Sequence, residues 1–233
     1  MIDIHSHICY GIDDGSKSIE ESIELLKKLS SEGVTDLFLT PHYMVDTSYT
    51  ADNKTKKQIV KELTKICKKE NIDINLYLGN EIYIDDSIDK LIKDKQISTM
   101  NDTKYILVEF SLFQYSSNYM LMIHNLITKG YKVILAHPER YIYLNKNDIL
   151  EELLDMGVLL QGNYLSLFNK YGKDAEKKLI YMLKNKYISF LGTDMHHYEE
   201  LYGNKLEKKL LKITKDKEYV KDILSRNVEK YLL

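Results

Sequence analysis

Residues 1–7 read MIDIHSH, and the short apolar run from Ile2 to His5 ends in a His-x-His pair. A short apolar run that is bounded by polar residues is typical of a buried strand. The same order of features, an apolar run followed by histidine or carboxylate residues, recurs along the chain. This recurrence predicts a fold in which the ends of the strands carry the polar chemistry.

Short apolar runs alternate with longer amphipathic segments along the whole chain. The predicted strands are 2–5, 36–40, 74–79, 104–109, 132–136, 159–162 and 188–192. The predicted helices are 19–30, 54–69, 119–129, 148–156 and 175–185, with two more in 205–233 that we expect to pack on the outside. Glycines 33, 130 and 157 lie just past three of these helices, where a C-terminal glycine is expected. Strands that alternate with helices indicate a parallel α/β fold.

The length of 233 residues and the number of repeats favour one barrel-like domain over an open sheet. We therefore expect an α/β fold of the TIM-like type, a distorted (β/α)7 barrel that spans residues 1–233.

The composition limits the classes of function. The formal net charge is −2, whereas nucleic-acid-binding proteins usually have a basic excess, so no nucleic-acid partner is expected. No run approaches the roughly 20 apolar residues that cross a bilayer, and residues 1–15 do not resemble a signal peptide. Cys9 and Cys67 form no CxxC pair or disulfide framework. We therefore expect a cytoplasmic protein without direct membrane insertion.

Histidines and carboxylates gather where the predicted strands end. The chain has seven histidines, of which His124 falls within a predicted helix and His197 simply adjoins His196. Those that follow predicted strands are His5, His7, His42, His137 and His196. Carboxylates recur at the same level, namely Asp13, Asp14, Glu81, Glu109 and Asp194. The carboxyl ends of barrel strands converge on one face, so we expect these side chains to meet there.

This set of side chains predicts a metal cluster. Imidazole nitrogens and carboxylate oxygens suit zinc, manganese and iron. The ligands are too many for one tetrahedral ion, so two or three divalent ions are expected. Carboxylates packed together without cations would raise one another's pKa at a cost in free energy. Each motif alone has an ordinary explanation, such as a turn at Asp13-Asp14-Gly15, and only their joint placement favours a metal site.

Taken together, the motifs resemble the PHP (polymerase and histidinol phosphatase) superfamily. Within it, the chain is most similar to the bacterial capsule-type (CpsB-like) metal-dependent protein-tyrosine phosphatases. The resemblance runs from residue 2 to about residue 197. Its motifs are Asp3-Ile4-His5-Ser6-His7, Gly11-Ile12-Asp13-Asp14-Gly15, Thr40-Pro41-His42, Gly79-Asn80-Glu81-Ile82, His137-Pro138-Glu139-Arg140-Tyr141, Gln161-Gly162-Asn163 and Thr193-Asp194-Met195-His196.

The resemblance implies a ligand for each position of a three-metal site. The implied ligands are His5, His7, Asp194 and the bridging Glu81 for one ion, Glu81, Glu109 and His137 for a second, and Asp14, His42 and His196 for a third. Manganese is the implied metal, with iron or zinc as other candidates. Arg140 would contact the phosphate, so the expected catalytic residues are Arg140, Glu81 and Asp194.

One departure from the family pattern concerns phosphate binding. The resemblance implies a further arginine after Asp194-Met195-His196, but the next arginine is Arg226. Lys205 is the candidate replacement, although lysine offers a point charge rather than the two-pronged donor of arginine.

The resemblance implies a phosphomonoesterase that removes phosphate from an autophosphorylated tyrosine kinase of capsule or exopolysaccharide synthesis. A metal-activated water would be the nucleophile. Neither cysteine lies in a Cys-x5-Arg loop, which argues against the cysteine-dependent phosphatase mechanism. The alternatives are a small-molecule phosphatase of the histidinol-phosphatase type, a metal-dependent amidohydrolase and a non-catalytic regulatory domain. An amidohydrolase normally carries a carboxylated lysine on a central strand, where this chain offers Glu109.

Overall fold

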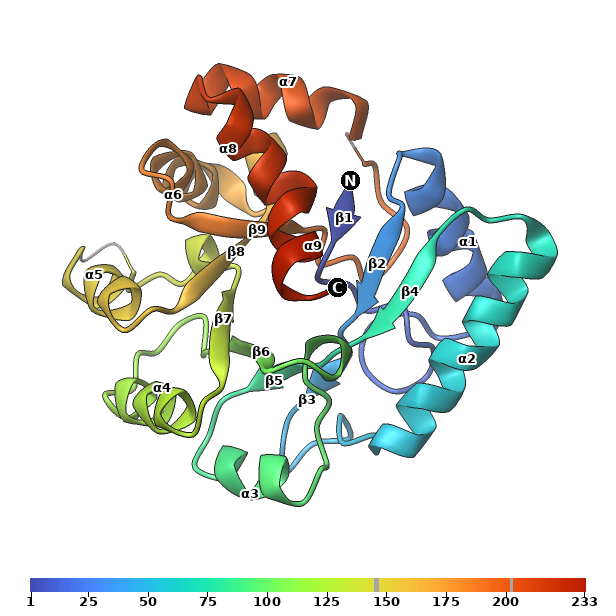
Figure 1. Ribbon diagram of the computed structural model, residues 1–233, viewed down its shortest axis with the longest axis horizontal. Coiled ribbons are helices and arrows are strands. Elements are labelled where there is room, and N and C mark those ends of the chain that lie inside the picture. Colours follow the sequence, from blue (N-terminus) through green and yellow to red (C-terminus); the bar gives the residue numbers. More distant parts are fainter. Residues whose placement is uncertain (145–146, 202) are drawn as a thin grey trace.

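The computed structural model describes residues 1–144, 147–201 and 203–233. Its strands lie at the centre and its helices surround them (Figure 1). The strands are β1 (Ile2–Asp3), β2 (Asp36–Leu39), β3 (His42–Tyr43), β4 (Asn75–Leu78), β5 (Glu81–Tyr83), β6 (Tyr105–Glu109), β7 (Lys132–Ala136), β8 (Leu159–Asn163) and β9 (Ile188–Gly192). Every described strand pair is parallel, which confirms the α/β class.

The strands form two parallel sheets, β1-β2-β4 and β3-β5-β6-β7-β8-β9. The predicted strands 36–40 and 74–79 correspond to β2 and β4, and each is followed by a short strand that was not predicted, β3 and β5. Pro41, which has no N–H to donate, separates β2 from β3, and Gly79 and Asn80 separate β4 from β5. Beyond these breaks, His42 of β3 lies directly opposite Glu81 of β5. The pairing of β3 with β5 therefore brings two of the expected ligands, His42 and Glu81, side by side.

The segment after β1 connects the first strand to both of its neighbours. The backbone N–H of Asp194 donates to the carbonyl oxygen of His5 at 2.9 Å, and that of His7 donates to Met195 at 2.8 Å. On the other side, the N–H of Thr40 donates to the carbonyl oxygen of Ser6 at 2.8 Å. The residues that follow β1, β2 and β9 are thus held next to one another.

The helices follow the amphipathic segments. They are α1 (Ile19–Ser31), α2 (Asn53–Glu70), α3 (Ile88–Lys93), α4 (Asn118–Thr128), α5 (Asn147–Asp155), α6 (Gly172–Lys184), α7 (Gly203–Thr214), α8 (Lys217–Lys221) and α9 (Asn227–Tyr231). α1 is capped at its N-terminus by Ser18, whose side chain accepts from the N–H of Glu21. The helix buries Leu25, Leu26 and Leu29. Gly33, Gly130 and Gly157 all adopt positive φ after helices, as predicted.

Short helical turns complete the chain between the longer elements. They are η1 (Met100–Asp102), η2 (Pro138–Arg140), η3 (Tyr164–Phe168) and η4 (Asp222–Arg226), of which η4 is a π-helical turn that links α8 to α9. α3 and η3 were not predicted, because elements of five or six residues are too short to show a helical period.

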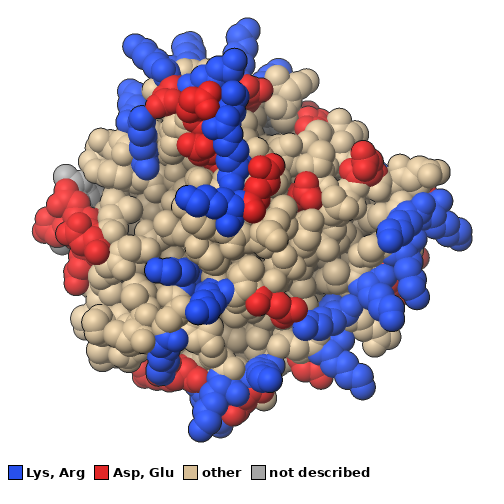
Figure 2. All heavy atoms as spheres, viewed as in Figure 1, with Lys and Arg blue, Asp and Glu red and all other residues tan. Residues whose placement is uncertain are grey.

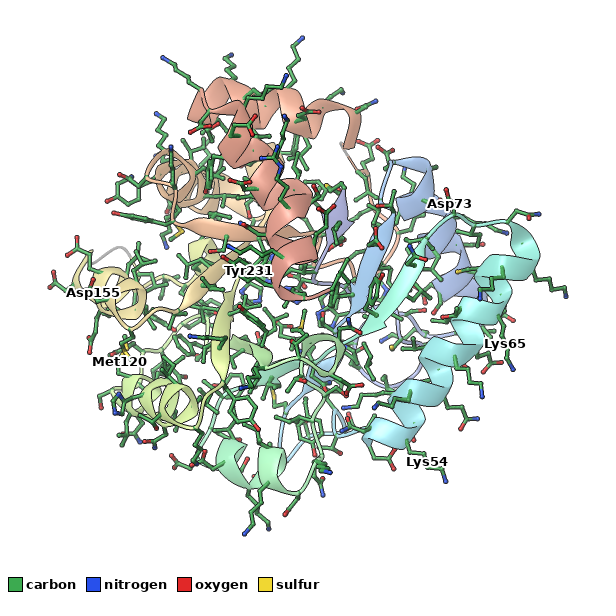
Figure 3. The ribbon with its side chains drawn as sticks, viewed as in Figure 1. Lys54, Lys65, Asp73, Met120, Asp155 and Tyr231 are labelled. Atoms are coloured by element: carbon green, nitrogen blue, oxygen red, sulfur yellow. The ribbon has the colours of Figure 1, made fainter. Side chains whose placement is uncertain are left out.

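The C-terminal helix closes the end of the strands opposite the expected metal site. Val228 and Leu232 belong to a buried cluster with Ile2, Phe38 and Phe190. Figure 3 places Tyr231 near the middle of the view, whereas Lys54 and Lys65 of α2 lie at its edge. The expectation that both C-terminal helices pack on the outside is therefore wrong for α9, because the apolar starts of the strands need a cover.

The surface carries both signs of charge. On the face shown in Figure 2, Lys and Arg side chains gather over α7 and α8 and along α2, with Asp and Glu side chains among them. Within the described ranges, we find no helix that has both the length and the apolar character required to span a bilayer.

Candidate metal centre

The expected ligands converge at the carboxyl ends of the strands. His42 and Glu81 lie on β3 and β5, and Glu109 is the last residue of β6. The segments after β1, β7 and β9 supply His5, His7, His137, Asp194 and His196. Asp14 comes from the loop that precedes α1. Segments that are distant in the sequence thus bring their donor atoms into three groups, each compact enough to hold one ion.

The first group contains His5, His7, Glu81 and Asp194, which are all buried. Glu81 Oε2 lies 3.2 Å from Nε2 of both His5 and His7. Asp194 Oδ1 lies 3.6 Å and 3.4 Å from the same two nitrogens. Donors that bind one ion at about 2.0–2.2 Å lie roughly 3–3.5 Å from one another. The group therefore has the dimensions of a single coordination shell.

The tautomers of His5 and His7 favour a cation at this point. The Nδ1 atoms lie 2.8 Å from acceptors, Gln161 Oε1 for His5 and Asp13 Oδ2 for His7, so each Nδ1 carries the proton of a neutral ring. Each Nε2 is then a lone pair, and the two Nε2 atoms face each other at 3.2 Å. Two lone pairs repel at this distance unless a positive charge lies beside them. The residues present therefore fit a metal ion.

The second group contains His42, Glu81 and Glu109. His42 Nδ1 lies 3.0 Å from Glu81 Oε2 and 3.2 Å from Glu109 Oε1. Both His42 Nδ1 and Glu81 Oε2 are buried and lack a hydrogen bond, as expected for atoms that face an ion rather than each other. His137, expected in this group, lies 2.8 Å from Glu81 Oε1 but 3.8 Å from Glu109 Oε2. It therefore borders the group through Glu81.

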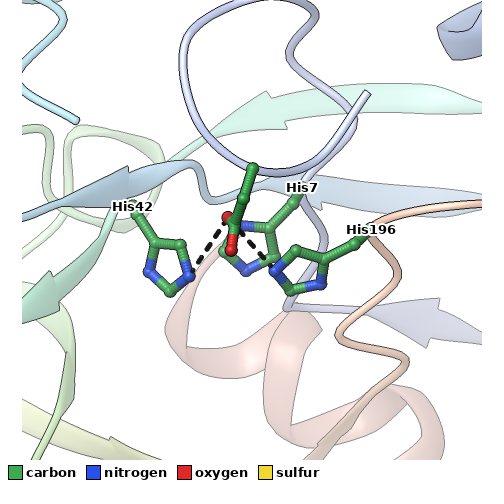
Figure 4. A group of neighbouring side chains, drawn as sticks. His7, His42 and His196 are labelled. Carbon is green, nitrogen blue, oxygen red and sulfur yellow. Dashed lines mark ion pairs between the residues drawn. The ribbon is translucent and has the colours of Figure 1, made fainter. Parts of the chain in front are cut away.

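The third group contains His7, Asp14, His42 and His196. The dashed lines in Figure 4 mark the ion pairs that join Asp14 Oδ1 to His42 Nε2 at 3.6 Å and to His196 Nε2 at 3.5 Å. Three of these residues are the expected set, and His7 is the addition. Because Nδ1 of His7 is bound to Asp13, only its Nε2 is available, and this atom already belongs to the first group.

The pKa values of the buried ligands depend on the opposite charges of their neighbours. Without an ion in the site, burial by itself would lower the pKa of His5, but Glu81 and Asp194 raise it to about 9, so the ring takes up a proton next to these carboxylates, where a bound cation would leave it neutral. Burial alone would raise the pKa of Glu81, but His5 and His42 hold it well below its usual range. The carboxylates are thus ionised at neutral pH in a site where charge must be compensated nearby.

A second layer of side chains orients the expected ligands. Asp13 Oδ2 accepts from His7 Nδ1 and from the backbone N–H of His42 at 3.0 Å. Gln161 Nε2 donates to Asn163 Oδ1 at 2.9 Å, and Asn163 Nδ2 donates to Asp194 Oδ2 at 2.8 Å. Such partners fix the ring orientation and the tautomer of metal ligands. The Gln161-x-Asn163 motif therefore serves the centre from β8.

Asp3 is a buried supporting residue that belongs to the first motif but was assigned no role from the sequence. Its carboxylate accepts from the backbone N–H of His5 at 3.0 Å and from the Thr193 hydroxyl at 2.7 Å. It therefore joins the segment after β1 to the segment after β9. Its position two residues before His5 was a usable signal, because alternate residues of a strand share one face.

Two of the expected ligands have unusual backbone conformations. His137 has φ of 33° and Asp194 has φ of 53°, which is the left-handed region. A non-glycine residue in this region is destabilised by about 1–3 kcal/mol, and such residues cluster at functional sites. The fold keeps both conformations, and they direct these side chains into the cluster.

Arg140 lies beside the centre rather than in it. Its NH1 atom donates to Asp194 Oδ2 at 2.6 Å, so Asp194 presents one oxygen to the histidines and the other to Arg140. A pocket of about 340 Å³ opens here, and it is lined by Arg140, Lys170, Tyr171, Asp194, His196, His197, Tyr198 and Glu199. Lys205, the candidate replacement for the second arginine, is not among these lining residues; it lies on α7. Lys170 and Tyr171 were not predicted as site residues.

Related proteins point to the same chemistry. CapC of Staphylococcus aureus is 38% identical over 197 residues, which cover 84% of this chain and 77% of that protein. The tyrosine-protein phosphatase CpsB of Streptococcus pneumoniae is 34% identical over 206 residues, which cover 85% and 84%.

A solved structure and a family model complete the comparison. The structure comes from a study of YwqE of Bacillus subtilis and CpsB of Streptococcus pneumoniae, described as unique metal-dependent tyrosine phosphatases. It matches with a TM-score of 0.91 and 26% identity, over all of this chain and 94% of the other. The model for capsular polysaccharide synthesis proteins of the CpsB/CapC type matches residues 1–233. The chain that builds this cluster of histidines and carboxylates is therefore a member of the CpsB/CapC family.

Proposed function

We propose that this chain is a metal-dependent phosphomonoesterase that acts as a protein-tyrosine phosphatase. The observation that carries the proposal is the buried group of His5, His7, Glu81 and Asp194, in which the two imidazole Nε2 atoms and the two carboxylates converge, with 3.2 Å between the Nε2 atoms. The membership in the CpsB/CapC family supports it, because relatives are named tyrosine-protein phosphatases. A hydrolase with a metal centre is thus the function that the geometry supports best.

We infer that two or three divalent ions occupy the three groups, with manganese as the first candidate and iron or zinc as the others. The ligands would be His5, His7, Glu81 and Asp194 for one ion, Glu81, Glu109 and His137 for a second, and Asp14, His42 and His196 for a third. When bound, such ions lower the pKa of a water molecule toward neutrality and neutralise charge on phosphoryl oxygens.

The side chains around the pocket suit a phosphate ester. The Arg140 guanidinium carries five N–H donors, of which one is directed to Asp194, so others can bind phosphate oxygens. The ring of Tyr171 packs against the guanidinium, with 4.5 Å between the guanidinium carbon and the ring centroid. Arg140 is therefore held in place at the edge of the centre while 23% of its side chain stays exposed.

Two features favour a phenolic ester over an alkyl ester. Phenol has a pKa of about 10 and leaves more readily than an alkoxide, so the site needs less help from a general acid. Tyr198, with 67% of its surface exposed, lies at the same pocket and offers an aromatic face to a substrate ring.

The cysteines do not support the alternative phosphatase chemistry. Cys9 and Cys67 are both buried free thiols. Burial raises the pKa of both, so neither is a thiolate at neutral pH. The reaction therefore has to proceed without a cysteine nucleophile.

The proposed partner is a phosphotyrosine protein, specifically an autophosphorylated tyrosine kinase of polysaccharide export. The description of the family, capsular polysaccharide synthesis, supports this choice. We also propose that residues 1–233 form one domain and that the two sheets complete a distorted seven-stranded barrel. The hydrogen bonds from the segment after β1 to both β2 and β9 support this arrangement.

The test compares three substrates with the same metal-loaded protein. Phosphotyrosine peptide, histidinol phosphate and p-nitrophenyl phosphate are assayed with added Mn²⁺, after EDTA treatment and after Mn²⁺ is restored. We expect hydrolysis of the two aryl phosphates, loss of activity with EDTA and recovery with Mn²⁺. Activity that resists chelation would remove the metal mechanism, and a preference for histidinol phosphate would assign the small-molecule alternative.

A further inference from the structure

The pocket beside the metal centre contains a second cation besides Arg140. Lys170 lies between η3 and α6, and 31% of its side chain is exposed. It is one of the residues that line the pocket of about 340 Å³, together with Arg140 and Asp194. None of the family motifs recognised in the sequence includes Lys170. Its position therefore has to be explained from the structure.

Tyr171 holds both cations on one aromatic ring. The Arg140 guanidinium carbon lies 4.5 Å from the ring centroid, and Lys170 Nζ lies 5.1 Å from the same centroid. Both distances are within the range of a cation–π interaction. The Tyr171 hydroxyl donates to Asp194 Oδ2 at 3.3 Å. One side chain thus connects the two cations to a residue of the metal centre.

Glu199 holds the Lys170 ammonium at the pocket without occupying all of its donors. Glu199 Oε2 lies 2.5 Å from Lys170 Nζ. An ammonium group has three N–H donors, so donors are left for a second acceptor. The other oxygen of Glu199 is buried without a hydrogen bond, so the carboxylate is directed inward rather than toward solvent. The ion pair therefore orients Lys170 within the pocket.

We propose that Lys170 is a second phosphate-binding residue of this enzyme, which contacts a phosphoryl oxygen on the side of Arg140. The assignment rests on the proposed function and deepens it. A phosphate monoester carries about two negative charges at neutral pH, and Arg140 already shares its charge with Asp194. Lys170 likewise shares its charge with Glu199, so the two paired cations together offer their remaining N–H donors to the phosphoryl oxygens. Lys170 thus supplies the cation that Lys205 was expected to provide.

The test removes the charge of Lys170 and leaves the metal ligands untouched. The variants are Lys170→Met, which removes the charge, and Lys170→Arg, which keeps it. Lys173→Met is the matched control, because Lys173 is exposed on α6 outside the residues that line the pocket. Binding of inorganic phosphate to the Mn²⁺-loaded protein is measured by calorimetry. KM and kcat are measured with p-nitrophenyl phosphate.

We expect Lys170→Met to weaken phosphate binding and to raise KM by about tenfold each, which corresponds to about 1.4 kcal/mol. Lys170→Arg should stay within about threefold of the wild type, since it retains a charged donor. Lys173→Met should match the wild type. If Lys170→Met unfolds, as judged by circular dichroism, Lys170→Gln replaces it in the same comparison.

The outcomes separate this inference from the proposed function. Unchanged phosphate binding and unchanged KM in Lys170→Met would overturn the role of Lys170 while the phosphatase activity stands. A wild type that hydrolyses no phosphomonoester, yet binds phosphate through Lys170, would overturn the proposed function alone. A Mn²⁺-loaded wild type that neither binds phosphate nor hydrolyses p-nitrophenyl phosphate would overturn both.

Discussion

Glu81 is the carboxylate that two of the three candidate groups share. One of its oxygens lies within 3.2 Å of nitrogens of His5, His7 and His42, and the other lies 2.8 Å from His137 Nε2. Because the side chain is fully buried, its negative charge has no water to stabilise it and relies on these neighbours. Loss of that charge should therefore affect more than one ion.

We expect Glu81→Gln to reduce the activity on p-nitrophenyl phosphate at least about 100-fold, more than the loss that follows removal of an outer partner of a metal ligand. The bound metal, measured by elemental analysis, should fall in parallel. Glu24→Gln on the exposed face of α1 is the matched control and should keep both values. A Glu81→Gln protein with the metal content and activity of the wild type would contradict the bridging role.

Single residues differ in how far the sequence could predict them. The ligand candidates were predictable because each follows a strand within a recognisable motif, as His5 and Glu81 do. Lys170 and Tyr171 were not, because they lie in a connection between η3 and α6 whose path is decided by packing. His42 was predicted to follow the second strand, but its place directly opposite Glu81 depends on the break at Pro41.

At the level of elements, α9 completes the apolar interior. Leu232 is fully buried among the strands, whereas Leu233 has 50% of its surface exposed. The carbonyl oxygen of Leu232 also accepts from the Asn101 side chain at 2.9 Å. The last turn of the chain is thus bonded to the turn that precedes β6.

We expect Leu232→Ala to reduce the free energy of unfolding by about 2–4 kcal/mol, because it leaves a cavity among side chains that cannot fully collapse. Leu233→Ala should change it by less than about 0.5 kcal/mol. Urea denaturation followed by circular dichroism measures both. Equal effects of the two substitutions would show that α9 does not cover the interior.

α2 is fastened to the break before β5 by a buried lysine. Lys56 is 1% exposed, and its ammonium donates to Asn80 Oδ1 at 2.6 Å. The amide of Asn80 in turn donates to the Pro41 carbonyl oxygen at 2.8 Å. Burial lowers the pKa of Lys56 to about 7, although Cys9 and Asp52 act in the opposite direction. The ammonium group of Lys56 therefore lies in an interior that lacks the water needed to stabilise its charge.

The low pKa of Lys56 predicts a dependence of stability on pH. Between about pH 7 and 10.5, Lys56 is protonated in the unfolded chain but largely neutral in the folded one. At Lys56 the folded state binds fewer protons in this window, so this residue contributes a rise of the free energy of unfolding with pH of at most about 1.4 kcal/mol per pH unit. Lys56→Met should reduce this slope, and the exposed Lys57→Met should keep it. Equal slopes in all three proteins would contradict the assignment.

Element prediction succeeded where a period could be counted. The boundaries of β7 and β9 agree with the sequence, and α1 differs by one residue. The short strands β3 and β5 were missed, because Pro41 and the Gly79-Asn80 pair were read as strand ends rather than as interruptions. The packing of α9 over the starts of the strands was not predicted, because the apolar face of a helix does not show which surface it packs against.

For the whole molecule, metal binding should add to the stability of the fold. Ions that bind only the folded state stabilise it by about 2.7 kcal/mol at a concentration of 100 times Kd. For a chain of this size we expect Mn²⁺ to raise Tm by about 5–10 °C relative to the EDTA-treated protein. Differential scanning calorimetry measures this shift. The Glu81→Gln variant should show a smaller one, and an equal shift in both proteins would place the metal elsewhere.

The segment after β1 and the segment after β9 meet at the centre, since the Thr193 hydroxyl donates to Asp3, 190 residues earlier. The histidines near residue 5 therefore leave the ribosome long before Asp194 and His196 exist. A nascent or truncated chain that stops before β9 lacks Asp194 of the first group and His196 of the third group. Hydrolytic activity therefore requires a chain that has been synthesised at least through residue 196, and shorter nascent chains are inactive.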